Sequence, residues 1–139
     1  MENLINNLNI YLSNLNVFYR KLQNYHWNIK GKSFFVVHAK LEEYYNEINE
    51  QIDEVAEHIL AIGGVPLATL KDYLNTTKIT EAKNEKVTCE VVFSEIVKDY
   101  NELLQDSKNI KVLADVESLA SRTAFWQGTK QAWIRLWAN

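Results

Sequence analysis

Two histidines and three carboxylates between residues 26 and 57 have spacings suited to metal binding. His38 and Glu42 are four residues apart, and Asp53 and Glu57 repeat that spacing further along. Residues four apart lie on one face of a helix, one turn after the other. His26 precedes a short glycine-containing segment, so a tight turn would bring it beside His38. Imidazole and carboxylate donors without thiolate suit Fe(II), Mn(II) or Zn(II) better than copper(I) or a cluster.

Each of these residues also has an ordinary structural interpretation. A carboxylate pair on a helix is usually a solvated face, and the same stretch also carries Glu43, Glu47, Glu50 and Glu54. A histidine beside a turn is more often a surface or capping residue than a ligand. It is the combination of the five that favours a metal site.

The distance between the two pairs indicates where such a site would form. Glu42 and Asp53 are eleven residues apart, which is three helical turns with about 20° left over, so they share a face. They are nevertheless about 16 Å apart along the axis, and metal–ligand bonds are only about 2 Å long. If two copies of this helix pack antiparallel about a twofold axis near Glu47 and Ile48, each pair meets the other copy's opposite pair. The spacing therefore predicts two equivalent sites at one dimer interface.

A metal site inside one helical bundle has a different signature, Glu-x-x-His on two helices. The positions three before the histidines hold Gln23, Phe35 and Val55 instead. The sequence therefore disfavours a di-iron site within the bundle.

Helices must position these residues, because apolar residues recur at steps of three and four and only four Gly and one Pro interrupt the chain. Gly31 and the pair Gly63–Gly64 are expected to end the first two helices, with Ser33 and Thr69 as caps of later ones. Long helices are predicted over 3–28, 33–62, 87–107 and 112–137, with a short helix over 69–74 inside the long connection 65–86. Short, long and short connections predict a ferritin-like four-helix bundle, an all-α fold in a single domain of residues 1–139.

The bulk composition limits the class of protein. The net charge is −3, which gives no generic surface for nucleic acid. A lone cysteine, Cys89, excludes an intrachain disulfide and a thiolate metal site. With no signal-peptide pattern at the start and no long apolar run, we expect a soluble, cytoplasmic protein without membrane contact.

Several motifs together resemble the Dps family of mini-ferritins. They are Asn24-Tyr25-His26-Trp27-Asn28-Ile29-Lys30-Gly31, Phe34-Phe35-x-x-His38, Asp53-x-x-Ala56-Glu57-x-Ile59 and Gly63-Gly64-x-Pro66. The similarity is dense over residues 18–66. It is looser afterwards, where Lys130-x-x-Trp133-x-x-x-x-Ala138 is similar to the family's ending.

The resemblance implies a hollow dodecamer built from twofold dimers, with two-iron ferroxidase sites between subunits. It implies oxidation of Fe(II), preferably by hydrogen peroxide rather than oxygen, storage of ferric mineral, and protection against oxidative stress. By position, His26, His38 and Glu42 come from one chain, and Asp53 and Glu57 from the other. Zinc or manganese could substitute for iron. Trp27 beside His26 is an interface residue or an electron donor, and position 42 is often Asp in the family.

The chain also departs from the family pattern. Many members bind DNA through a Lys-rich tail, but the first basic residue here is Arg20 and no such tail is present, so DNA binding is not expected. His58 stands where the family commonly has Arg, and Asp115 and Glu117 are candidates for an iron-entry pore. A DNA-compacting protein and a structural shell with a non-redox metal site remain the alternatives.

Overall fold

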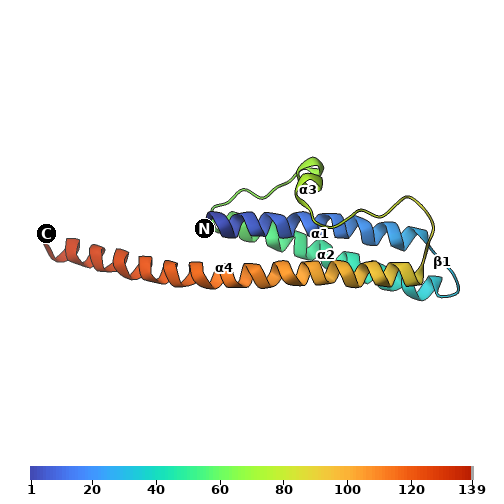
Figure 1. The fold of residues 1–139 in the computed structure, drawn as a ribbon. Coiled ribbons are helices and arrows are strands. Elements are labelled where there is room, and N and C mark those ends of the chain that lie inside the picture. The colour runs from blue at the N-terminus through green and yellow to red at the C-terminus, as the bar shows by residue number, and fades with distance from the viewer. Residues whose placement is uncertain (139) are drawn as a thin grey trace.

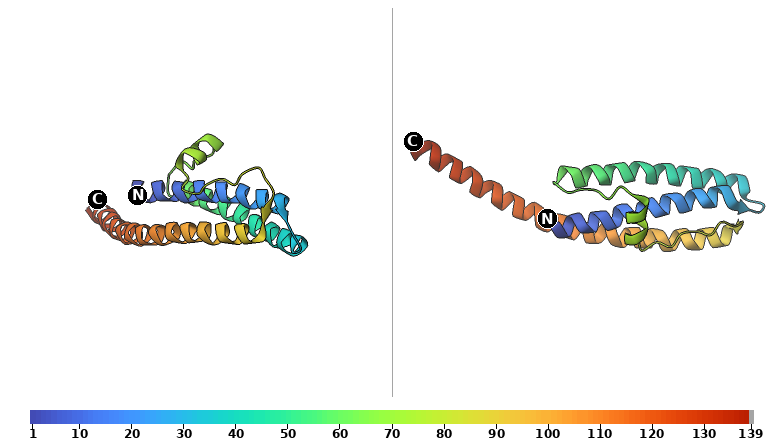
Figure 2. Two further views of the ribbon diagram at one scale, coloured as in Figure 1. Left: turned by 45° about the vertical axis from the view of Figure 1, so that its right-hand side comes forward. Right: turned by 90° about the horizontal axis from the view of Figure 1, so that it is seen from above.

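Three long helices lie side by side in the computed structural model, which describes the backbone of residues 1–138 and the side chains of residues 1–118 (Figure 1). The first helix, α1 (Glu2–Asn28), is antiparallel to both α2 (Phe34–Ala61) and α4 (Cys89–Ala138). The chain crosses back along the bundle between α2 and α4, and the short α3 (Leu70–Thr76) lies within that crossover (Figures 1 and 2). The helices predicted over 3–28, 33–62 and 69–74 are confirmed to within a few residues.

The core forms where the apolar stripes of these helices meet. α1 places Phe18 and three leucines at its centre, all fully buried, and α2 and α4 add further aliphatic residues. Burying one such side chain contributes about 1.5–3 kcal/mol. The core residues with at most 2 % exposure are Leu12, Leu15, Phe18, Leu22, Ile29, Leu41, Ile48, Ile59 and Val92.

The helix ends follow the predicted signals with one difference. Gly31 and Gly63 both adopt positive φ, +115° and +85°, a region that residues with a side chain rarely occupy. Thr69 caps α3, because its hydroxyl oxygen accepts a hydrogen bond from the Asp72 amide at 3.1 Å. Ser33 precedes α2 as predicted, but its side chain makes no capping hydrogen bond.

A pair of two-residue strands is present although the sequence predicted none. β1 (Ile29–Lys30) pairs in parallel with β2 (Val87–Thr88), which joins the α1–α2 turn to the start of α4. Strands this short show no alternation of polar and apolar residues, so periodicity could not reveal them.

The separation of residues 87–107 and 112–137 into two helices was wrong. The backbone continues as one helix, α4, of 50 residues, and its second half extends beyond the bundle (Figures 1 and 2). Residues 107–116 contain neither Gly nor Pro, and Lys111 pairs with Asp115 one turn on at 3.2 Å. No local residue therefore forces the turn that a four-helix pattern suggests. Within the described chain, no helix is both long and apolar enough to cross a bilayer.

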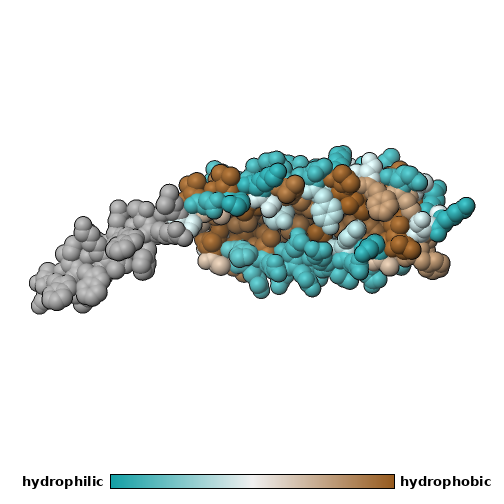
Figure 3. All heavy atoms as spheres, turned by 90° about the horizontal axis from the view of Figure 1, so that it is seen from below, coloured by the Kyte–Doolittle hydropathy of each residue, from teal (hydrophilic) through white to brown (hydrophobic). Residues whose placement is uncertain are grey.

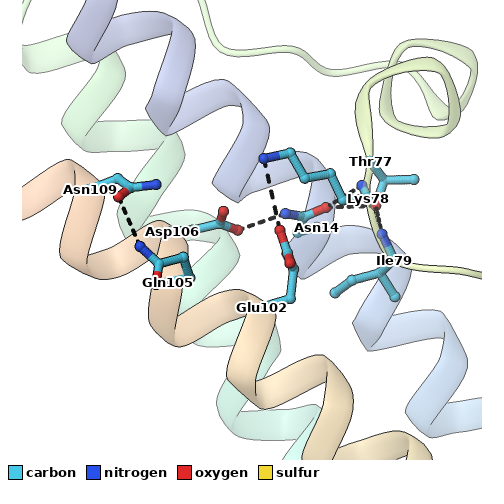
Figure 4. A network of polar contacts seen from close by, with 8 residues as sticks. All are labelled: Asn14, Thr77, Lys78, Ile79, Glu102, Gln105, Asp106 and Asn109. Atoms are coloured by element: carbon cyan, nitrogen blue, oxygen red, sulfur yellow. Dashed lines mark hydrogen bonds and ion pairs between the residues drawn. The ribbon is translucent and has the colours of Figure 1, made fainter.

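A polar network fastens the crossover to the bundle (Figure 4). The buried Asn14 donates to Asp106 of α4 at 2.6 Å, and its carbonyl oxygen accepts from the Thr77 hydroxyl and the Lys78 amide, both at 2.8 Å. Burial raises the pKa of Asp106, and the nearby Glu102 adds to that effect, whereas the bond from Asn14 opposes it. One side chain thus joins α1, α4 and the crossover.

A buried lysine makes the second polar link between α1 and α4. The Lys21 ammonium is 2.8 Å from Asp99 and 2.9 Å from Glu95, and both Lys21 and Asp99 are almost fully buried. Burial disfavours the charged lysine, but its contacts with Asp99 and Glu95 outweigh that effect and raise the pKa of Lys21. The lysine therefore remains charged inside the protein.

Candidate metal centre

The α1–α2 turn brings two of the predicted ligands together. His26 lies in the last turn of α1, and His38 lies early in α2, on the other side of the short turn. Their rings stack with centroids 3.5 Å apart and planes 13° from parallel. His26 is buried and His38 half-buried. Phe34 packs against His38 at 4.9 Å, so the pair lies in a partly apolar setting.

Reciprocal hydrogen bonds hold the two rings. Nδ1 of His26 lies 2.6 Å from the carbonyl oxygen of His38, and Nδ1 of His38 lies 2.7 Å from the carbonyl oxygen of His26. A carbonyl oxygen only accepts, so each Nδ1 carries the hydrogen. The neutral ring then keeps its lone pair on Nε2, the tautomer that a metal-binding histidine needs. In this tautomer each ring has on Nε2 the lone pair with which an imidazole binds a metal ion.

The three predicted carboxylates have a different environment. Glu42, Asp53 and Glu57 are all exposed on α2. Among residues 1–118, no lysine, arginine or histidine forms an ion pair with any of them. Three acidic groups without a cationic partner are free to bind a cation from outside the chain.

One chain does not bring the five residues into one group. In the part of the chain that the structure describes, no three His, Cys, Asp or Glu side chains come together as a metal-binding cluster. His26 and His38 meet, whereas Glu42 does not join them in a cluster and Asp53 and Glu57 lie further along α2. The five residues could therefore share one site only if a second chain supplied some of them.

Tyr45 is a neighbour of the site that the sequence analysis did not identify. Its ring meets that of His26 edge-on at 5.3 Å and that of Tyr19 at 5.9 Å. Desolvation raises the pKa of Tyr45, and the negative charge of Glu42 raises it further. Tyr45 follows His38 by seven residues, which is two helical turns, so both lie on one side of α2. This spacing could have identified Tyr45 from the sequence.

The other predicted site residues lie at the surface. Trp27 is 56 % exposed beside His26, and His58 is exposed on α2. Asp115 is exposed and pairs with Lys111, while Glu117 contacts the amino group of Met1.

The profile of the Ferritin family, described as a ferritin-like domain, matches residues 5–127. The chain is 44% identical over 107 residues to "DNA protection during starvation protein 2" of Bacillus anthracis. The aligned residues cover 77% of this chain and 73% of that protein. The chain belongs to the Dps family of ferritin-like proteins.

Two solved Dps structures support the fold. The Dps protein of Vibrio cholerae O1, described as a member of the ferritin-like diiron-carboxylate superfamily, superposes with a TM-score of 0.76 and 37% identity, over 78% of this chain and 68% of that one. Dps from Listeria innocua soaked with zinc gives a TM-score of 0.78 and 37% identity, over 83% of this chain and 77% of that one. The predicted all-α, ferritin-like fold is therefore confirmed, although the described chain joins the last two long helices into one.

Proposed function

We propose that this Dps-family chain is a ferroxidase and iron-storage mini-ferritin whose iron sites form between two chains. The observation that supports this best is the pair His26 and His38, each with Nδ1 bonded to the other's carbonyl and Nε2 left free. Asp53, Glu57 and Glu42 supply the unpaired carboxylates. The donor set contains nitrogen and oxygen only, which fits Fe(II).

We propose that a second chain, related by a twofold axis that passes beside α2, completes each site. His26, His38 and Glu42 of one chain would face Asp53 and Glu57 of its partner. In this arrangement Asp53, Glu57 and His26 bind the first Fe(II), and His38 and Glu42 help to bind a second. The twofold dimer generates two such sites, and we propose that dimers assemble further into a hollow dodecamer.

The reaction takes Fe(II) as substrate and an oxidant from solution, with hydrogen peroxide preferred over oxygen. Each of two Fe(II) ions gives one electron to one hydrogen peroxide, whose O–O bond breaks, and two protons complete two waters. Paired one-electron oxidation releases no hydroxyl radical, which is how the protein would protect against oxidative stress. Carboxylates such as the exposed Glu47 and Glu54 are proposed to nucleate ferric mineral.

Trp27 is proposed as a supplementary electron donor at this site. It adjoins His26 in sequence and is 56 % exposed in one chain. An interface that covers the histidine pair would also cover this indole. Replacing Trp27 by Phe should then leave Fe(II) oxidation intact while increasing radical products trapped during the reaction.

The shared site is tested by mixing two defective chains. The His38→Ala and Asp53→Ala variants should each lose most Fe(II) oxidation, read as ferric absorbance after adding anaerobic Fe(II) and peroxide. When unfolded and refolded together, the two should recover activity, because a mixed dimer contains one site with all wild-type ligands. His58→Ala, an exposed histidine on the same helix, is the matched control and should retain full activity. No recovery in the mixture would contradict the shared site.

Two alternatives give different results in simple assays. A structural shell with a non-redox metal would bind zinc but yield no ferric absorbance with Fe(II) and peroxide. A Dps structure from Listeria innocua was soaked with zinc. A DNA-compacting protein would retard DNA in a gel at low salt; the Bacillus anthracis relative is named for DNA protection. The net charge of −3 opposes such binding, so we expect free DNA mobility.

A further inference from the structure

Two tyrosines continue the group of rings that begins with the histidine pair. The ring of Tyr45 in α2 lies 5.3 Å from that of His26, with the two planes 79° apart. The ring of Tyr19 in α1 lies 5.9 Å from that of Tyr45, with the planes 87° apart. Edge-on contacts at such distances are a preferred arrangement of aromatic side chains. Each ring is therefore in contact with the next, from His26 through Tyr45 to Tyr19.

The first two helices hold this line of rings from both sides. Tyr19 and His26 are seven residues apart on α1, and His38 and Tyr45 are seven residues apart on α2. Seven residues are about two helical turns, so each tyrosine lies on the same side of its helix as one histidine. Both tyrosines are half-buried. We call Tyr45 and Tyr19 the tyrosine pair.

The far end of the tyrosine pair has a hydrogen-bond donor. Nε2 of Gln23 donates to the hydroxyl oxygen of Tyr19 at 3.1 Å. A phenol that loses an electron also loses its hydroxyl hydrogen, because the oxidised phenol is a strong acid. Its oxygen can then only accept hydrogen bonds. The amide of Gln23 therefore favours the radical form of Tyr19.

The proposed oxidation requires two electrons for each hydrogen peroxide, and one Fe(II) supplies only one of them. In the proposed site the second Fe(II) has fewer ligands than the first, so a site can hold a single Fe(II) when peroxide arrives. One electron alone would split peroxide into hydroxide and a hydroxyl radical. A phenol in contact with a ligand ring is a chemically suitable source of the missing electron.

We propose that Tyr45 supplies the second electron when a site holds one Fe(II), and that Tyr19 then reduces Tyr45 and keeps the radical. The His26 ring, in contact with Tyr45, lies between the phenol and the iron. This inference rests on the proposed ferroxidase function, because the iron and the peroxide come from that reaction.

The electrons and protons of this step balance. Fe(II) and the phenol of Tyr45 each give one electron to one hydrogen peroxide, whose O–O bond breaks. The phenol proton and one proton from solvent complete two water molecules, which leaves Fe(III) and a neutral tyrosyl radical. Tyr19 then passes one electron and one proton to Tyr45. A later Fe(II) gives its electron to the Tyr19 radical, which takes a proton from solvent and becomes a phenol again.

A neighbouring tyrosine has different surroundings. Tyr44 precedes Tyr45 in α2 and is also half-buried, but one residue turns the helix by about 100°, so the two face different sides. The ring of Tyr44 lies 6.4 Å from that of Tyr100 in α4, which lies 5.0 Å from that of Phe18. On the side of the bundle where α4 lies, hydrophobic side chains form a band between polar margins (Figure 3). Tyr44 thus belongs to a separate aromatic group and is the matched control for Tyr45.

Electron paramagnetic resonance of the full chain tests the proposal. Wild-type protein is loaded anaerobically with one Fe(II) per site, mixed with hydrogen peroxide and frozen during the reaction. A tyrosyl radical should appear, and its spectrum should narrow when the protein is made with ring-deuterated tyrosine. That labelling leaves a radical on Trp27 unchanged, so the two donors are distinguished. Loading with two Fe(II) per site should weaken the tyrosyl signal, because the second iron then supplies the electron.

Three variants locate the radical. Tyr45→Phe should lose the tyrosyl signal and should increase the hydroxyl radical that a spin trap captures at one Fe(II) per site. Tyr19→Phe should leave the radical on Tyr45 with an altered spectrum, because the Gln23 donor is not bonded to that phenol. Tyr44→Phe should retain the wild-type signal. Each change keeps the aromatic ring, and thermal unfolding followed by circular dichroism should show the wild-type fold in all three.

Three results would overturn electron supply by the tyrosine pair. They are an unchanged tyrosyl signal in Tyr45→Phe, an unchanged spectrum in Tyr19→Phe, and a wild-type signal that deuterated tyrosine does not alter. Wild-type protein that forms ferric iron without any tyrosyl radical would also refute it, while leaving the ferroxidase function in place. Failure of the ferroxidase function itself is distinct, since the wild type would then give no ferric absorbance at either iron loading.

Discussion

Two groups of carboxylates in this protein have opposite surroundings. Asp99 and Asp106 of α4 are buried, and each contacts a polar group of α1, Lys21 or Asn14. Glu42, Asp53 and Glu57 of α2 are exposed and have no cationic partner among residues 1–118. A carboxylate that one chain already satisfies serves its fold, while one left unsatisfied is available to a ligand. The contrast identifies the acids that serve the fold, but Glu50 and Glu54 of α2 are also exposed and without an ion pair among residues 1–118. Spacing, and not exposure, therefore distinguishes the three proposed ligands.

Removal of the buried lysine should have the largest effect on stability. Lys21→Met leaves Asp99 buried without its cation, and breaking one partner of a buried pair costs about 3–5 kcal/mol. The free energy of unfolding, measured by urea denaturation, should fall by that amount. Lys40→Met is the control, because Lys40 and its partner Glu43 are both exposed. Solvent screens an exposed pair, so its loss changes stability little, and equal losses in the two variants would refute the structural role of Lys21.

Neutralising a carboxylate on α2 should affect iron chemistry and not stability. Asp53→Asn should lower the initial rate of Fe(II) oxidation by about 10–100-fold, as is typical when a metal site is perturbed. Its free energy of unfolding should change by less than about 0.5 kcal/mol, because the side chain is exposed. Glu54→Gln, the neighbouring exposed acid, should retain the rate. A loss of stability in Asp53→Asn would place this acid with the structural group.

Asp106→Asn should raise the free energy of unfolding at neutral pH. The size of this gain should be smaller than the loss expected for Lys21→Met. The amide oxygen of the new side chain can still accept the hydrogen bond from Asn14, and no charge is then buried. Burial raises the pKa of Asp106 in the folded state, so folding favours its protonated form. The wild type therefore loses stability as pH rises through that raised pKa.

The advantage of Asp106→Asn should accordingly be present at pH 7 and disappear below the ordinary carboxyl pKa of 3.8. Urea midpoints of both proteins at several pH values measure the difference. An advantage that persists unchanged in acid would show that its cause is not the buried charge.

Glu95→Gln should have the smallest effect and the opposite pH dependence. The bond from Lys21 lowers the pKa of Glu95, an effect that partial burial opposes. A lowered carboxyl pKa stabilises the fold above the ordinary value of 4.5 and is lost as pH falls through the lowered one. Because the side chain is one-third exposed, solvent screens the pair, and we expect a loss below about 1 kcal/mol at neutral pH. Urea denaturation at neutral and acid pH should show the two proteins converging in acid.

Local sequence signals predicted the parts of the fold that depend on neighbouring residues. The stripes of α1 and α2, the positive φ of Gly31 and Gly63 and the cap at Thr69 all follow from residue type and spacing over one or two turns. The approach of His38 to His26 followed from the short turn alone.

Features that depend on distant segments were not predictable in this way. The bond from Asn14 to Asp106 joins residues 92 positions apart, and nothing near either residue indicates the other. The end of the third helix was misplaced because a four-helix pattern implied a turn where residues 107–116 provide no helix-breaking residue. The five-residue metal site remains a prediction, since its ligands would come from two chains.

The β1–β2 pair joins the helices at one end of the bundle, whereas at the other end the described residues contain no strand pairing. Ile29 and Lys30 are bonded to Val87 and Thr88, close to the stacked histidines, so the ends of α1, α2 and α4 are tied together there. At the opposite end, α4 simply continues past the start of α1 (Figure 1). A change in the position of α4 at that other end can therefore leave the histidine pair in place. Mutations in the β1–β2 pair should accordingly disturb the stacked histidines, whereas mutations in the second half of α4 should leave them in place.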